Sequence, residues 1–280
     1  MFERLSNSWE LVKASAAVLR ADKELVVFPI VSSIGVLIVT ATFAVPMLLT
    51  GFLDSILASD AEVLGAIVAF LFYLVQYIVI FFANTALVGA AMIRLGGGDP
   101  TVRDGFHIAF SHMRQILGYA VIAATVGVIL RWLSRRGGFI GQIASALAGM
   151  AWNIATFLVV PILVVEDIGP IDAVKRSVDL LKRTWGEQIV GNFSIGLIFG
   201  LLMFAVLLIG VPAIVLAAMT ESVALIVLAV LVLALTLVFM GLISSTLSGI
   251  YTAAVYQYAV TGEAGGYFRE DMIENAFRRK

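Results

Sequence analysis

The chain has 280 residues, of which 61% are hydrophobic and only 13% are charged, and its formal net charge is −1. Soluble domains carry roughly 25% charged residues, so the composition excludes an ordinary soluble domain, and the balanced charge gives no sign of a nucleic-acid partner. The absence of cysteine excludes disulfides, thiolate nucleophiles and cysteine-ligated metals.

Six long stretches of the sequence contain no charged residue. In chain order they cover residues 25–49, 63–93, 116–130, 139–165, 188–220 and 222–258. A helix of about 20 apolar residues crosses the hydrocarbon core of a bilayer. The sequence therefore predicts an all-α, polytopic membrane protein with six transmembrane helices in a single domain, residues 1–280. The third stretch is short, and it crosses fully only with apolar residues taken from the segment before it.

The basic residues are distributed unevenly between the two sides of the membrane. Fifteen of the 18 lie in the N-terminal segment, the second and fourth loops and the C-terminal tail, which all fall on one side. The positive-inside rule then places both termini in the cytoplasm. The remaining three, Arg131, Arg135 and Arg136, go against this rule. Two interpretations stay open: they lie near external lipid phosphates, or the third span is re-entrant.

Three segments before the odd-numbered spans have apolar residues at helical spacing: residues 1–20, 103–117 and 171–185. Each is too polar on one face to cross lipid, so we expect three amphipathic helices lying near the cytoplasmic interface. Basic side chains there are attracted to anionic lipids. The candidate lipid-facing residues are aromatic and basic side chains of these helices: Trp9, Phe106, Phe110, Trp185, Lys175, Arg176, Lys182 and Arg183.

The order of an amphipathic helix followed by a transmembrane hairpin occurs three times, over residues 1–93, 100–165 and 170–259. Residues 8–13 match residues 177–182 in residue type at every position except Trp9, and the second and third units both begin with proline. Each hairpin starts and ends on the cytoplasmic side, so the repeats would be parallel and related by rotation about the membrane normal. The alternative is the ordinary similarity of any hairpins in a six-span protein.

Polar side chains occur inside several of the predicted spans. Helix packing is one explanation, because small and hydroxyl side chains let helices approach and bond in lipid. The other is a polar seam that holds a substrate or a lipid headgroup. We favour packing, and the candidate residues of such a seam are Asn84, Asn153, Thr156, Asn192, Ser245, Ser248 and Thr252.

No span carries a full charge near its middle, which argues against a pump or a proton-coupled transporter. Asp104, His107 and Ser111 fall on one helical face in the order acid, base, nucleophile, but adjacent turns of one helix rarely orient a triad. His107 and His112 are poorly spaced for a shared metal. The sequence therefore predicts no catalytic residue, no metal site and no cofactor, and we expect the protein not to be an enzyme.

Several local motifs resemble those of a known family. They are Ser8-Trp9-Glu10, the run from Leu19 to Leu25 leading into Phe28-Pro29, Ala173-Val174-Lys175-Arg176-Ser177 and Trp185-Gly186-Glu187. Together they are similar to an uncharacterised prokaryotic six-span membrane family of the domain-of-unknown-function type, which implies a plasma-membrane protein and assigns no catalytic residue. The motifs resemble more weakly the membrane domain attached to some glycerophosphoryl diester phosphodiesterases. That activity is not carried over, because the chain has no phosphodiesterase domain.

Two functional hypotheses from different classes follow. The first is a non-enzymatic component that interacts with membrane lipids or organises a protein partner or a second copy of itself, without nucleic acid. The second is a passive transporter or channel for lipids or small amphiphiles, built on the polar faces of the spans. A solid apolar core with a charged cytoplasmic face would favour the first, and a continuous polar cavity the second.

Overall fold

The computed structural model describes residues 2–51, 62–185, 194–263, 266–268 and 273. Within these ranges every regular element is a helix, and six segments are long and apolar enough to cross a membrane. The protein is therefore a multi-pass α-helical membrane protein, as the sequence predicts. The elements are α1 (Phe2–Ala21), the 3₁₀ turn η1 (Lys23–Val26), α2 (Val27–Leu49), α4 (Glu62–Leu95), α5 (Val102–Ser111), α6 (Met113–Arg136), α7 (Gly138–Ala155), α8 (Val159–Val165), α9 (Pro170–Trp185), α10 (Ser194–Met219) and α11 (Val223–Thr261).

The third span is longer than its uncharged stretch suggests. Helix α6 has 24 residues, which corresponds to about 36 Å of helix. The prediction of one continuous helix over residues 103–117 is wrong, because α5 ends at Ser111 and α6 begins after His112. The Ser111 hydroxyl donates to the Ile108 carbonyl at 2.8 Å, and His112 Nδ1 lies at the same distance from that oxygen. Side chains that bond to nearby carbonyls compete with the helical ladder, and here they mark its end.

The fourth span consists of two helices, α7 and α8, separated by a turn at residues 156–158. Pro161 has no N–H to offer the carbonyl of Phe157, so the regular helix is interrupted on its N-terminal side. The freed N–H of Leu158 donates instead to the hydroxyl of the buried Ser177 on α9, at 3.2 Å. The interruption thus connects the fourth span to the amphipathic helix that follows it.

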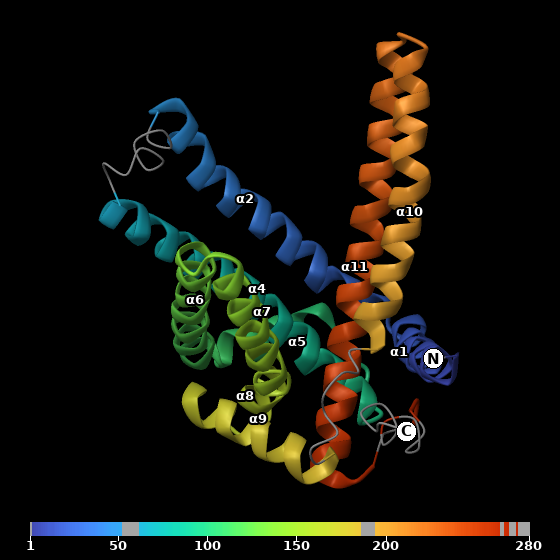
Figure 1. Cartoon of the computed structure of the whole chain (residues 1–280). Coiled ribbons are helices and arrows are strands. Elements are labelled where there is room, and N and C mark those ends of the chain that lie inside the picture. Colours follow the sequence, from blue (N-terminus) through green and yellow to red (C-terminus); the bar gives the residue numbers. More distant parts are fainter. Residues whose placement is uncertain (1, 52–61, 186–193, 264–265, 269–272, 274–280) are drawn as a thin grey trace.

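The buried core lies at one end of the molecule, where the spans meet α1, α5 and α9 (Figure 1). Its largest contributions come from the end of α4 and from residues 247–256 of α11, and α1 and α8 also contribute. The most apolar windows of α10 and α11, in contrast, contain no buried residue. In Figure 1 the outer part of the α10–α11 hairpin stands well apart from α2 and α6. All three hairpins therefore begin and end at this core, and their outer parts expose apolar side chains.

The three predicted units occur in the expected order, as α1–α2–α4, α5–α6–α7–α8 and α9–α10–α11. In the first two units a single residue separates the leading helix from the next element: Asp22 before η1 and His112 before α6. In the third unit the corresponding joint, residues 186–193, lies outside the described residues. The rotation of the units about the membrane normal stays a prediction.

Two glycines allow close helix approaches that hold the core together. A Cβ at Gly105 of α5 would overlap the Phe28 ring and would lie 2.9 Å from the backbone oxygen of Ala86. A Cβ at Gly249 of α11 would overlap the side chain of Leu87 on α4. Helix α5 is thereby pressed against both α2 and α4, and α11 against α4.

Gly105→Ala should destabilise the protein by about 1–2 kcal/mol, since the overpacking costs about 1–3 kcal/mol and exceeds the gain of up to about 1 kcal/mol in helix propensity. The measurement is the unfolding midpoint of the purified protein in detergent, followed by tryptophan fluorescence. Gly200→Ala is the matched control, because nothing lies within 4 Å of a Cβ at Gly200 in α10. Equal midpoints for the two variants would contradict the packing described here.

Candidate functional site

The predicted aromatic residues of the leading helices lie around the core end with different exposures. Trp9 on α1 is 47% exposed and Phe110 on α5 is 65% exposed. Phe106 is half-buried, with its ring centroid 5.2 Å from that of Phe28 and 5.9 Å from that of Phe82. The structure thus presents Trp9 and Phe110 to the surroundings, whereas Phe106 belongs to the packing of α5. The side chain of the fourth predicted aromatic residue, Trp185, lies outside the described residues.

The four predicted basic residues of α9 divide into two groups. Lys182 and Arg183 are exposed in the last turn, and neither forms an ion pair with a described residue. Lys175 pairs with Asp172 at 3.0 Å in the exposed first half of the helix. These three side chains are exposed, whereas Arg176 is half-buried and points inward.

Arg176 is held by the end of the fourth span. Its Nε lies 3.1 Å and 3.0 Å from the two carboxylate oxygens of Glu166, and the Tyr256 hydroxyl donates to Glu166 at 3.2 Å. Beside this cluster, Gln115 Nε2 donates to Asp167 at 2.6 Å. Arg176 therefore fastens α9 to α8 and α11 instead of serving as a free lipid contact.

The polar residues predicted as a seam are scattered over several environments. Asn84 on α4 and Ser248 on α11 are half-buried, whereas Asn153 on α7 and Ser245 on α11 are exposed. Asn192 lies outside the described residues. The structure therefore does not gather these side chains into one buried polar path within the part of the chain that it describes.

Hydroxyl groups in the spans mostly bond to their own helix. Thr156 donates to the Trp152 carbonyl at 2.8 Å, and Thr252 donates to the Ser248 carbonyl at 2.9 Å. Thr125 and Thr246 make the same bond to the carbonyl four residues earlier. These four hydroxyl protons are therefore already donated and do not require a substrate. Bonds between helices also occur: the Ser145 hydroxyl donates to the Leu130 carbonyl, and the Gln76 amide donates to the Thr40 hydroxyl, both at 2.8 Å. These bonds agree with the packing interpretation.

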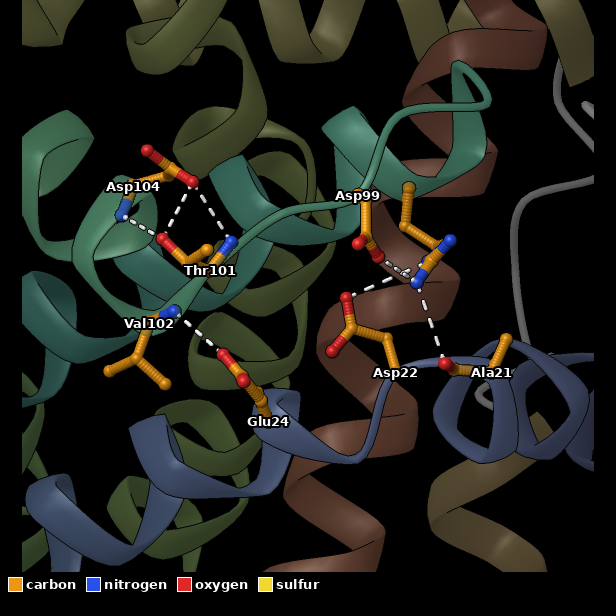
Figure 2. Close-up of polar contacts among 8 residues, drawn as sticks. Ala21, Asp22, Glu24, Asp99, Thr101, Val102 and Asp104 are labelled. Carbon is orange, nitrogen blue, oxygen red and sulfur yellow. Dashed lines mark hydrogen bonds and ion pairs between the residues drawn. The ribbon is translucent and has the colours of Figure 1, made fainter.

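A second charged cluster, absent from the sequence predictions, surrounds Arg94 at the end of α4. Its Nη2 lies 2.7 Å from Asp99 Oδ1 and donates to the Ala21 carbonyl at 3.4 Å, while its Nε lies 3.6 Å from Asp22 Oδ2. Figure 2 shows Asp22 and Ala21 from the end of α1 and Asp99 from the loop after α4 gathered here. The only signal for this cluster in the sequence is that Asp22 directly precedes the first span and Arg94 lies at the end of the second.

Asp22 is a nearly buried carboxylate in this cluster, with 5% of its side chain exposed. Burial raises the pKa of the Asp22 carboxyl above its ordinary value, and the Arg94 guanidinium opposes that shift. The carboxylate therefore depends on Arg94 for its charge compensation. The pair fixes the joint between α1 and α2 against the end of α4.

The start of α5 is fixed by two further carboxylates, Glu24 and Asp104 (Figure 2). The Val102 N–H donates to Glu24 Oε2 at 3.0 Å, and Thr101 and Asp104 form a reciprocal capping box. The hydrogen bonds from Thr101 lower the pKa of Asp104. Helix α5 is thus capped both by its own residues and by the first span.

The acid–base–nucleophile order read from α5 does not form a triad. The Asp104 carboxylate accepts from the Thr101 hydroxyl at 2.7 Å. Ser111 Oγ lies 3.2 Å from His112 Nδ1, whereas His107 is exposed to the surroundings. Among the described residues, moreover, no three acidic, histidine or cysteine side chains are grouped closely enough to hold a metal ion.

Arg94→Gln should lower the free energy of unfolding by about 2–3 kcal/mol, because it leaves the desolvated Asp22 carboxylate without its compensating cation. Asp22→Asn should cost less, and the double variant should cost less than the sum of the two. Urea unfolding of the detergent-solubilised protein measures all three. Lys13→Gln is the control, because its exposed pair with Glu10 should contribute less than about 1 kcal/mol. Additive effects of the two substitutions would show that Asp22 and Arg94 do not depend on each other.

Comparison with known proteins identifies a family but no characterised relative. No curated protein and no solved structure matches the chain, and nothing supports the weaker resemblance to the phosphodiesterase-associated membrane domain. The model of a family of unknown function, DUF6159, matches residues 63–266, from the start of the second span to just beyond α11. The match covers more than half of the chain, and the protein belongs to this family of unknown function.

Proposed function

We propose that the protein is a non-enzymatic component of the plasma membrane whose cytoplasmic surface binds anionic lipids and organises a protein partner or a second copy of the chain. The observation that carries the proposal is the single-ended core: α1, α5 and α9 pack against one end of all three hairpins. From that end Trp9, Phe110, Lys182 and Arg183 are exposed. Aromatic and basic side chains together are the combination that an interfacial helix uses to bind a charged bilayer surface.

The charges at this end favour a lipid surface over a binding pocket. The buried or half-buried carboxylates, Asp22 and Glu166, are matched by Arg94 and Arg176 within the fold. The exposed basic residues at the margins are free to meet lipid phosphates, and each contributes about 1 kcal/mol near an anionic leaflet. This division supports a structural role for the inner pairs and a lipid-binding role for the outer cations.

The remaining assignments follow from the same features. The proposal includes a cytoplasmic position for both termini, which the excess of basic residues on their side supports. The absence of catalysis is supported by the satisfied hydroxyls and by the structural use of Asp104 in the α5 cap. A passive transport path receives less support, because the polar residues of the spans are scattered.

The topology can be tested with single cysteines, because the natural chain contains none. Cysteines at Lys13 and Glu263 should be shielded from an impermeant thiol reagent in intact cells and become reactive after lysis. A cysteine at Glu221, in the turn between α10 and α11, should react in intact cells. The reverse labelling pattern would overturn the orientation.

Lipid binding can be tested by reversing charges at the end of α9. Lys182→Glu with Arg183→Glu should reduce the preference for phosphatidylglycerol over phosphatidylcholine by roughly fivefold per residue, since each cation contributes about 1 kcal/mol. Electron spin resonance of spin-labelled lipids measures this preference in vesicles that contain the full chain.

Two controls make the lipid test specific. Asp179→Lys on the same helix adds an exposed cation and should raise the preference, whereas His107→Ala on α5 should leave it unchanged. An unchanged preference after the double reversal would reject α9 as a lipid-binding element. If His107→Ala abolished a cellular activity while folding and lipid preference survived, the proposal that the protein is not an enzyme would be wrong.

A further inference from the structure

The far end of the α6–α7 hairpin combines basic residues with exposed apolar ones. Arg131 and Arg135 are exposed in the last turns of α6, and Gly137 alone joins α6 to α7. Directly after this turn Phe139 is 78% exposed and Ile140 is 79% exposed. This hairpin tip, residues 131–140, lies on the side of the membrane opposite to the core.

Arg131 contacts α4 at a position well inside the outer, N-terminal end of that helix. Its Nη1 donates to the Tyr73 hydroxyl at 2.5 Å, and its guanidinium carbon lies 5.9 Å from the centroid of the Tyr73 ring. Beyond Tyr73, α4 continues outward over residues 63–72, which include no charged residue. That segment corresponds to about 15 Å of helix, and Val63, Leu64 and Ile67 within it are at least half exposed.

The position of Arg131 along α4 is set by the packing of α6 against α4, and not by the reach of the arginine side chain alone. Along the same antiparallel pair, the rings of Phe81 and Tyr119 lie 4.4 Å apart. One turn further out on α4, Tyr77 lies 3.4 Å from where a Cβ of Gly127 would be. The contact between Tyr73 and Arg131 continues this register by another turn. Arg131 therefore lies opposite a residue about ten positions inward from Val63, the outer start of the apolar run of α4, and Arg135 lies about one turn further out.

A guanidinium at that level is costly unless anions and water reach it. Insertion of arginine at the centre of a transmembrane helix costs about 2.5–3.5 kcal/mol, and snorkelling and local thinning of the bilayer reduce the cost. Tyr73 offers a hydroxyl oxygen and a ring face but no negative charge. Within the described ranges, no carboxylate pairs with Arg131 or Arg135.

We propose that phosphate groups of the outer phospholipids are drawn inward to Arg131 and Arg135, so that the bilayer is locally thinned around the α6–α7 hairpin. Phosphate is the anion that a lipid surface provides. The uncharged part of α6, residues 116–130, corresponds to about 22 Å of helix, which is shorter than the hydrocarbon core of about 30 Å. A short apolar span is accommodated by thinning of the bilayer and by snorkelling of its flanking residues. This inference concerns the face opposite to the proposed lipid-binding surface and does not depend on it.

The test uses Trp132, which neighbours Arg131, as the only tryptophan of the full chain, with the other three replaced by phenylalanine. The protein is reconstituted in dioleoyl phosphatidylcholine vesicles in phosphate-free buffer. Quenching is compared between lipids that carry a nitroxide on the headgroup and lipids that carry it at mid-chain. In the wild-type background we expect the headgroup nitroxide to quench more strongly.

Arg131→Leu with Arg135→Leu should release the phosphates, and the ratio of headgroup to mid-chain quenching should then fall by at least about threefold, since apolar bilayer closes over the tip. Arg131→Lys with Arg135→Lys should keep the ratio, because lysine retains the charge. A tryptophan at Met219, at the outer end of α10, is the positional control and should not respond to either pair of substitutions.

Two results would overturn the proposal. Stronger mid-chain quenching in the wild-type background would show that phosphates do not reach the tip. An unchanged ratio in the leucine variant would show that the tip lies at the ordinary bilayer surface and draws nothing inward. The leucine variant makes the span more apolar, so its insertion is retained, and circular dichroism verifies its helix content.

Discussion

Apolar side chains gain little by exchanging lipid for a protein interior, and this constraint governs how the spans of this protein associate. The outer parts of α10 and α11 expose apolar side chains on nearly every turn. What holds the hairpins together is concentrated at the other end, where α1, α5 and α9 supply surfaces that water would otherwise meet. There the hydrophobic effect operates fully, and the largest buried side chains, such as Phe28, Leu163 and Ile250, lie there.

The polar contacts of the core end reinforce this arrangement at its joints. Three of these contacts connect a span to a leading helix or to its neighbour: Arg94 to Asp22, Glu24 to the start of α5, and Glu166 to Arg176. Charged groups at the edge of the hydrocarbon can remain ionised when they are paired and partly hydrated. These charged residues, which are of the types that form catalytic or binding sites, instead fix the angles between the helices.

The hairpins are unequal in length, and this inequality gives the two faces of the protein different characters. Helix α11 has 39 residues and α4 has 34, whereas α6 has 24 and ends in arginines. At the core end, α1, α5 and α9 pack against the ends of the spans. At the opposite end, Arg131 contacts Tyr73, about ten residues inward from the outer start of the apolar run of α4.

The sequence by itself determined the features that depend on local composition. Six uncharged runs were enough to predict six spans, and apolar spacing was enough to place the helices that became α1 and α9. The division between α5 and α6 at His112 was missed, because it depends on which side chain bonds to the Ile108 carbonyl. Only the tertiary structure decided that Arg176 points to Glu166, that Arg94 meets Asp22 and that Arg131 rests on Tyr73. Hydropathy is a property of each segment, whereas the partner of a charge depends on how distant segments pack, and one sequence without its fold does not specify that.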